Sequence, residues 1–301
     1  MAVIPTTESI AGEERRAHGV GSVMVVGAGT MGRGIAQVCA EAGYPTLLFD
    51  ADAANLERGF GAIDAAWVKL ADKGKKSPND IAAYRDRLAV AASVDAAAGV
   101  DLVIEAIYEH LDAKLALYRG IDAVIAPSAI LASNTSSISI TRLAAGTTDP
   151  ARFVGLHFFN PVPILPLVEV VRGLRTADST ADRAAAFARS LGKTPVTVND
   201  APGFVANRIL LPMINEAVFT LAEGVASKES IDEVMKLGMA HPIGPLALAD
   251  LIGLDVCLDI LQTLHRDFGD SKYRPAPLLV RMVASGALGR KTGEGFYRYD
   301  R

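Results

Sequence analysis

A glycine-rich turn near the start of the chain constrains its fold more than any other feature. The segment Gly27-Ala28-Gly29-Thr30-Met31-Gly32 follows the apolar run VMVV and opens a stretch whose apolar residues have helical spacing. Asp50 ends a second apolar run, TLLFD, about twenty residues further on. Strand, glycine turn, helix, strand and carboxylate in this order are typical of a Rossmann dinucleotide-binding domain. The turn therefore predicts an α/β fold built on a parallel, doubly wound sheet.

Each part of this pattern has a physical role in holding a dinucleotide. Gly27 permits the tight turn, Gly29 lets a pyrophosphate approach the backbone, and Gly32 allows the helix to pack closely. The N–H groups and dipole of the helix N-terminus favour the same anion. Asp50 is expected to accept from the adenosine ribose and to repel a 2′-phosphate, and no arginine follows at positions 51 and 52. NAD is therefore expected rather than NADP, and a glycine turn without function is the alternative.

Strand-like and helix-like segments alternate up to about residue 200. Strands are expected at 23–29, 46–50, 101–107, 129–137, 153–159, 167–171 and 194–198, and helices at 31–43, 53–73, 110–125 and 182–192. The charged stretch DKGKKSPND interrupts this alternation. Beyond the sequence NDAPG, the remaining chain is expected to be helical almost to its end. We therefore expect a flexible tail at 1–20, an NAD-binding Rossmann domain at 21–202 and a helical domain at 203–301.

Composition and charge exclude several classes of partner. The formal net charge of −4, with 30 basic and 34 acidic residues, leaves no basic stripe for a nucleic acid. No run approaches the ~18 apolar residues of a membrane span, and the first twenty residues lack the features of a signal or transit peptide. The two cysteines, Cys39 and Cys257, show no metal-ligand spacing. We expect a cytoplasmic protein without a metal, a membrane or a nucleic-acid partner.

One histidine stands almost alone in the apolar segment GLHFFNPVPILPLVEVV. His157 and Glu169 belong to successive strand-like runs joined by a proline-rich turn, so adjacent strands are expected to bring them face to face. Oxidation of an alcohol by NAD requires a base for the hydroxyl proton, and an imidazole oriented by a carboxylate suits that task. The alternative is a satisfied core histidine beside a carboxylate of an edge strand. The upstream dinucleotide pattern favours catalysis.

Several stretches, taken together, resemble the L-3-hydroxyacyl-CoA dehydrogenase family. These are VVGAGTMGRGIAQVCAEAGY, LVIEAIYEHLDAK, SNTSSISIT, FVGLHFFNPVPILPLVEVV, DAPGFVANRILLP and GRKTGEGFYRY, and their order covers nearly the whole chain. The length with one helical domain is most similar to bacterial members that act on 3-hydroxybutyryl-CoA. The resemblance implies NAD-dependent interconversion of short-chain L-3-hydroxyacyl-CoA and 3-oxoacyl-CoA in fatty acid metabolism. It also implies a homodimer formed through the helical domain.

The resemblance assigns roles to residues that match the family motifs. It makes His157 the catalytic acid and base and Glu169 its orienting partner. It places Ser136 near the substrate hydroxyl and the nicotinamide, and Asn207 on the substrate carbonyl side. Without the family fold, Ser136 would be explained as a cap of the following helix, and Asn207 as a partner of a neighbouring loop.

For the cofactor, the resemblance adds four residues to the glycine turn, Asp50 and Ser136. They are Glu109, Lys114, Asn160 and Lys291.

For coenzyme A, the resemblance points to Lys73 and Ser136. The family serine on the same helix as Lys73 is replaced by Ala66 in this chain. Lys73 could equally belong to a solvated charge run.

Two other functions remain open from the sequence. A dehydrogenase of sugar acids such as L-gulonate shares the Rossmann and HFFNP elements. A non-catalytic NAD-sensing protein would have no need of the set His157, Glu169, Ser136 and Asn207.

Overall fold

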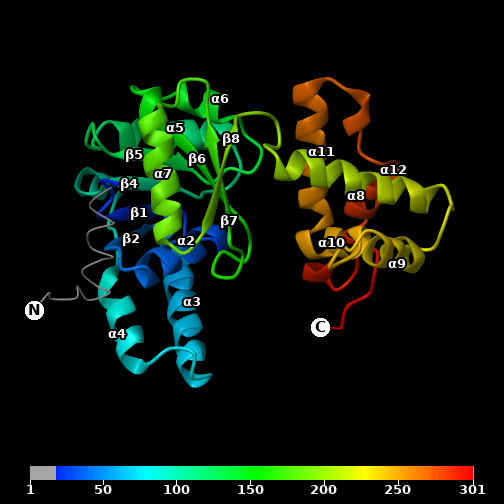
Figure 1. Cartoon of the computed structure of the whole chain (residues 1–301), viewed down its shortest axis with the longest axis horizontal. Helices are drawn as coiled ribbons and strands as arrows, with labels where there is room; N and C mark the ends of the chain where they lie inside the picture. The colour runs from blue at the N-terminus through cyan, green and yellow to red at the C-terminus, as the bar shows by residue number, and fades with distance from the viewer. Residues whose placement is uncertain (1–17, 301) are drawn as a thin grey trace, which may run out of the picture. The chain divides into compact units, whose positions relative to one another are not determined.

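The computed structural model describes residues 18–300, and the chain divides into two compact units, Met1–Asp200 and Ala201–Arg301. Most of the expected N-terminal tail, residues 1–17, lies outside the described residues. Both units are drawn in Figure 1.

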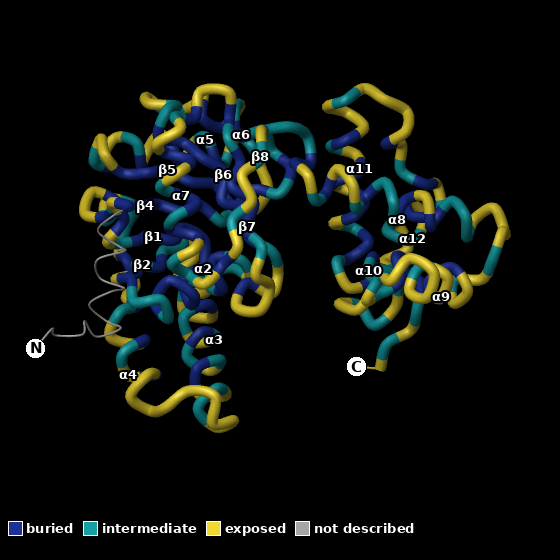
Figure 2. Tube along the Cα trace, viewed as in Figure 1, coloured by how far each residue is buried: buried dark blue, intermediate teal, exposed yellow. Residues whose placement is uncertain are grey.

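The first unit is built on a sheet of eight strands in the order β3-β2-β1-β4-β5-β6-β7-β8. Neighbouring strands are parallel except β6 and β7, which are antiparallel. The central strands are buried, whereas the edge strand β8 is largely exposed (Figure 2). The strands are β1 (Val23–Val26), β2 (Thr46–Phe49), β3 (Leu88–Val90), β4 (Leu102–Glu105), β5 (Ile130–Ser133), β6 (Phe153–Phe158), β7 (Leu167–Arg172) and β8 (Thr194–Asn199).

Helices cover this sheet, as a parallel sheet with buried faces requires. They are α2 (Thr30–Glu41), α3 (Ala53–Asp72), α4 (Pro78–Arg87), α5 (Leu111–Asp122), α6 (Ile140–Ala144) and α7 (Asp178–Ser190). One hydrophobic cluster joins strand residues to apolar residues of α2, α3, α4 and α7, such as Ile35, Trp67 and Phe187. In Figure 1, α7 crosses in front of the sheet. The predicted doubly wound architecture is confirmed.

Two elements of this unit were not predicted. The stretch DKGKKSPND does end α3, but a further helix, α4, begins within it at Pro78. Ser77 and Asp80 form a capping box at this helix, in which each side chain bonds to the other residue's backbone N–H. The short strand β3 follows α4 directly and pairs with β2.

The second unit is helical, as predicted. Its helices are α8 (Ala206–Ala222), α9 (Lys228–Gly238), α10 (Pro245–Ile252), α11 (Leu254–Phe268) and α12 (Pro277–Ala284). Their apolar faces form one buried cluster that includes Leu211, Leu246, Leu261 and Phe296. Across the described residues of both units, no helix combines the length and apolar character needed to cross a membrane.

Candidate active site

The glycine turn between β1 and α2 is packed tightly on its inner side. Gly27 has a φ of +108°, and a Cβ added there would lie 2.5 Å from the carbonyl oxygen of Ala106. A Cβ on Gly32 would lie 1.7 Å from the carbonyl oxygen of Gly27, so no side chain can be accommodated. At Gly29, by contrast, an added Cβ would meet nothing within 4 Å. The turn is therefore open at the glycine where a pyrophosphate must approach the backbone, and it fits a dinucleotide.

Asp50 follows β2 and contacts this turn directly. Its Oδ2 accepts from the backbone N–H of Ala28 at 2.8 Å and from Nδ2 of Asn55 at 2.5 Å. Its Oδ1 accepts from the N–H of Asp52 at 2.9 Å. A carboxylate oxygen has two lone pairs, so Oδ1 retains capacity for a ribose hydroxyl while Oδ2 holds the turn. Asp50 thus has a structural task beside the predicted recognition of the ribose.

His157 and Glu169 lie directly opposite each other on the antiparallel strands β6 and β7. The distance from His157 Nδ1 to Glu169 Oε2 is 2.8 Å, and both side chains are buried. The ring of Phe159 lies beside the imidazole, with 4.5 Å between the ring centroids. The carboxylate fixes the orientation of the imidazole, as an acid–base histidine requires. The expected face-to-face placement is therefore present.

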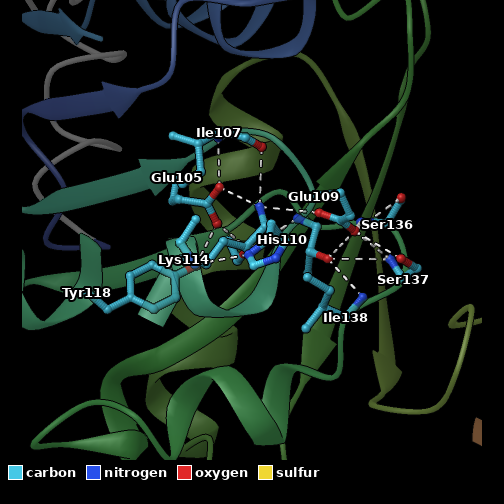
Figure 3. Close-up of polar contacts among 12 residues, drawn as sticks. Glu105, Ile107, Glu109, His110, Lys114, Tyr118, Ser136, Ser137 and Ile138 are labelled. Carbon is cyan, nitrogen blue, oxygen red and sulfur yellow. Dashed lines mark hydrogen bonds and ion pairs between the residues drawn. The ribbon is translucent and has the colours of Figure 1, made fainter. Parts of the chain in front are cut away.

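A carboxylate anchors the loop that follows β5. Glu109 Oε1 accepts from the backbone N–H groups of Ser136 and Ser137, at 3.0 and 3.1 Å, and from Thr135 Oγ1 at 2.5 Å (Figure 3). Burial favours the neutral acid, but the charge of Lys114 and these hydrogen bonds outweigh it, so the pKa of Glu109 lies below its ordinary value. Glu109 is therefore a carboxylate that holds Ser136 in place.

Lys114 lies beneath this loop, in a buried network centred on Glu105. Its side chain is 1% exposed, and Nζ lies 2.5 Å from Glu105 Oε1 and 3.3 Å from Glu109 Oε2. Glu105 Oε2 accepts from Tyr118 Oη at 2.6 Å and from Ser133 Oγ at 2.7 Å. Burial and the adjacent Glu105 carboxylate raise the pKa of Tyr118 well above its ordinary value. The structure thus places the ammonium group of Lys114 between the carboxylates of Glu105 and Glu109 (Figure 3).

Asn160 lies on the connection between β6 and β7 and is exposed. It contributes to a groove of about 230 Å³ formed by α2, α3 and this connection, to which Ala66 and Thr30 also belong. Lys73 is the C-cap residue of α3 and is exposed. The groove brings Asn160 close to the first turn of α2, whereas Lys73 does not line it.

Two predicted residues belong to the second unit. Asn207 lies in the first turn of α8 and is buried. Lys291 is half exposed, and its Nζ lies 2.5 Å from both carboxylate oxygens of Asp255.

The alternative role for Ser136, a helix cap, is not observed. Ser139 is the N-cap of α6, and its Oγ accepts from the N–H of Arg142. Thr135 Oγ1 instead accepts from the N–H of Ile138 at 2.9 Å, within the loop itself.

Two supporting residues escaped the sequence analysis. Glu105 organises the network under the loop, and Asn134 Oδ1 accepts from the N–H of Phe158 at 2.9 Å, next to His157. The sequence did contain a feature that indicates the role of Glu105. A carboxylate inside the apolar run DLVIEAI is expected to be buried and therefore to require hydrogen-bond or ion-pair partners.

Both units of the chain are similar to enzymes of one family. Residues 22–201 match the 3-hydroxyacyl-CoA dehydrogenase NAD binding domain, and residues 203–299 match the C-terminal domain of the same enzymes. The probable 3-hydroxybutyryl-CoA dehydrogenase of Bacillus subtilis is 51% identical over 278 residues, which cover 92% of this chain and 97% of that protein. The 3-hydroxybutyryl-CoA dehydrogenase of Bradyrhizobium diazoefficiens is 50% identical over 277 residues, covering 92% and 94%.

A solved structure is similar over the same extent. The crystal structure of (S)-3-hydroxybutyryl-CoA dehydrogenase from Ralstonia eutropha superposes with a TM-score of 0.90 at 50% identity, covering 94% of this chain and 100% of that one. Both halves of the chain, its dinucleotide turn and its buried histidine–glutamate pair therefore lead to one assignment. The chain belongs to the 3-hydroxyacyl-CoA dehydrogenase family.

Proposed function

We propose that this chain catalyses the NAD-dependent oxidation of short-chain L-3-hydroxyacyl-CoA to 3-oxoacyl-CoA, and the reverse reduction, with 3-hydroxybutyryl-CoA as its main substrate. The observation that carries the proposal is the buried pair of His157 and Glu169, 2.8 Å apart, in a chain with a dinucleotide turn. The choice of 3-hydroxybutyryl-CoA as substrate is supported by two relatives, 51% and 50% identical, that are named as dehydrogenases of this compound.

His157 is the proton-transfer group of this reaction. In oxidation it takes the hydroxyl proton of the substrate, and in reduction the protonated ring returns a proton to the carbonyl oxygen. Glu169 accepts from Nδ1, so Nε2 is the nitrogen that exchanges the proton with the substrate. The carboxylate also stabilises the imidazolium that forms during oxidation. When bound, NAD supplies the acceptor for the hydride that leaves the carbon.

The remaining residues bind and orient. The turn from Gly27 to Gly32 and Asp50 would hold the dinucleotide, together with four further residues and Ser136. The four are Glu109, Lys114, Asn160 and Lys291. Ser136 and Asn207 position the oxygen atoms of the substrate for transfer. Lys73 and Ser136 are the residues we propose for coenzyme A.

We also propose that the protein forms a homodimer in the cytoplasm. The helical unit exposes large apolar side chains on α8 and α9, among them Ile209, Val234 and Leu237, which favours self-association through this unit. Both cysteines are unpaired and buried, which suits a reducing compartment.

A steady-state assay tests the proposed activity. Oxidation of NADH and NADPH would be followed with 3-oxoacyl-CoA esters of increasing length, and reduction of NAD with L-gulonate. We expect acetoacetyl-CoA with NADH to give the highest kcat/KM, because the carboxylate of Asp50 repels a 2′-phosphate. Turnover of L-gulonate without turnover of any acyl-CoA would overturn the substrate assignment, and equal kcat/KM values with the two cofactors would overturn the role of Asp50.

A further inference from the structure

The connection between β6 and β7, residues 159–166, is poor in backbone donors. Pro161, Pro163 and Pro166 have no N–H, so the carbonyl groups of this segment outnumber its donors. Two of the remaining donors, the N–H groups of Ile164 and Leu165, both bond to the carbonyl of Pro161 at 3.0 Å. The other carbonyls need donors from elsewhere in the chain.

The start of β8 supplies those donors. Lys193 is 9% exposed, and its Nζ donates to the carbonyl oxygens of Val162 at 2.5 Å and Leu165 at 2.9 Å. The N–H of Thr194 donates to the carbonyl oxygen of Pro166 at 2.7 Å. Burial lowers the pKa of Lys193, and the charge of Glu41 opposes this effect. The hydrogen bonds of its ammonium group go to these two carbonyl oxygens. A lysine suits the task because it carries three donors and no acceptor.

Helix α2 holds the same connection from another side. The side chain of Val162 is 2% exposed, and a Cβ added to Gly34 would lie 3.0 Å from Val162 Cβ. Gly34 therefore provides a notch into which Val162 packs. Between this notch and the ammonium group of Lys193, Val162 is fixed through both its side chain and its carbonyl.

This double attachment matters because the connection is much longer than a two-residue hairpin turn. In a tight hairpin, the turn itself fixes the backbone on either side. Here the paired strands hold His157 and Glu169, but Asn160 lies outside the pairing, on the connection. The position of Asn160 thus depends on what holds residues 161–166.

We propose that Lys193 is a positioning residue of the active site, which holds the 159–166 connection so that Asn160 is in place for the cofactor. The inference rests on the proposed function, because it takes Asn160 to bind the cofactor. Lys193 itself touches neither reactant in this proposal and acts only through the connection.

The main test is Lys193→Met, which keeps a long apolar stem and removes the donors. We expect the Kd for NADH, measured by fluorescence titration, and the KM for NADH to rise about ten-fold, because a small displacement of a binding group is costly. At saturating NADH, kcat should fall by less than about three-fold, since β6 and β7 still pair His157 with Glu169. Lys236→Met, an exposed lysine on α9, is the matched control and should leave all three constants unchanged.

Hydrogen exchange gives a readout that does not depend on activity. In Lys193→Met, the amides of Ile164 and Leu165 should exchange faster, while those of β6 keep their protection. A second variant, Gly34→Ala, leaves Lys193 in place but pushes against Val162 from the opposite side. It should raise the Kd for NADH in the same direction and supplies the test if Lys193→Met does not fold.

The outcomes separate the two proposals. If the wild-type protein turns over no 3-oxoacyl-CoA, the proposed function fails whatever the exchange rates show. The positioning role is wrong if the wild type is active and Lys193→Met has the same Kd for NADH as the wild type, with unchanged amide exchange rates at residues 164 and 165. A lower Tm with unchanged Kd would also overturn it, since Lys193 would then support only stability.

Discussion

The positions of His157 and Glu169 are set by the pairing of β6 with β7. Two apolar runs joined by a proline-rich turn predicted adjacent strands, and the observed register places the two side chains opposite each other. Lys114 and Lys193 show the limit of such prediction. The local sequence around these two lysines does not indicate that they are buried. Contacts with Glu105 and with the carbonyls of Val162 and Leu165 explain their burial.

The first prediction concerns His157. His157→Gln retains a polar side chain that can still reach Glu169, so we expect it to fold and to bind NADH like the wild type. It cannot take or return a proton, so kcat should fall by roughly 10² to 10⁴. Steady-state kinetics beside a fluorescence titration with NADH would measure both. Turnover close to that of the wild type would show that the histidine is a core residue.

At the scale of elements, the long segments were predictable because their apolar spacing is clear. Helix α4 and strand β3 were not, since α4 is polar, with only Ile81 and Tyr84 buried, and β3 is three residues long. The capping box formed by Ser77 and Asp80 was the sequence feature that could have indicated the start of α4. Short elements depend on pairing with distant segments, as β3 does with β2, and their own sequence determines them weakly.

The glycine turn allows a paired prediction on one element. Gly29 has an ordinary extended conformation and open space at its Cβ position, so Gly29→Ala should keep the Tm of the wild type. The added methyl group would occupy the place of the pyrophosphate, and we expect the Kd for NADH to rise at least about ten-fold. Gly32→Ala should instead lower the Tm or prevent folding, because its Cβ would overlap the carbonyl of Gly27. Thermal unfolding and NADH titration distinguish the two, and equal effects of both variants on Tm would contradict the assignment.

The anchoring of the 135–137 loop by Glu109 predicts a dependence of stability on pH. The pKa of Glu109 in the folded state lies below its ordinary value of 4.5, so its contribution to stability is present above that value. The contribution is lost as the pH falls through the folded-state pKa. Glu109→Gln should therefore have a lower Tm than the wild type at neutral pH, by a few degrees, and the difference should disappear in acid.

Thermal unfolding across that pH range measures this difference. Glu57→Gln, an exposed side chain on α3, is the control and should match the wild type throughout. A difference between Glu109→Gln and the wild type that persists at low pH would show that the carboxylate charge is not what anchors the loop.

At the scale of the whole molecule, the change from alternating segments to helices near NDAPG predicts a domain boundary after residue 202. The division of the chain into two compact units falls between Asp200 and Ala201. The contacts that join distant segments within a unit could not be predicted. Examples are the hydrogen bonds of Asp50 with Ala28 and of Lys193 with Val162. These depend on how strands are ordered in the sheet, which local spacing does not specify.

The exposed apolar face of α9 leads to a prediction about assembly. Leu237 and Val234 are 79% and 61% exposed, which is costly for isolated apolar side chains of this size. Light scattering should give twice the chain mass of 31.6 kDa, and Leu237→Asp should shift the protein towards the monomer. Leu174→Asp, equally exposed on the first unit, should not. A dilute wild-type monomer with full activity would contradict a functional dimer.

Both cysteines of the chain, Cys39 and Cys257, are buried, and burial raises the pKa of each thiol, that of Cys257 to about 12. Because the thiolate is the form that reacts with maleimides, the natural chain offers almost no background for labelling. A cysteine introduced at exposed Lys75 and another at exposed Lys236 would therefore accept a donor and an acceptor dye selectively. Energy transfer between the two dyes would then report the distance between the two units during turnover.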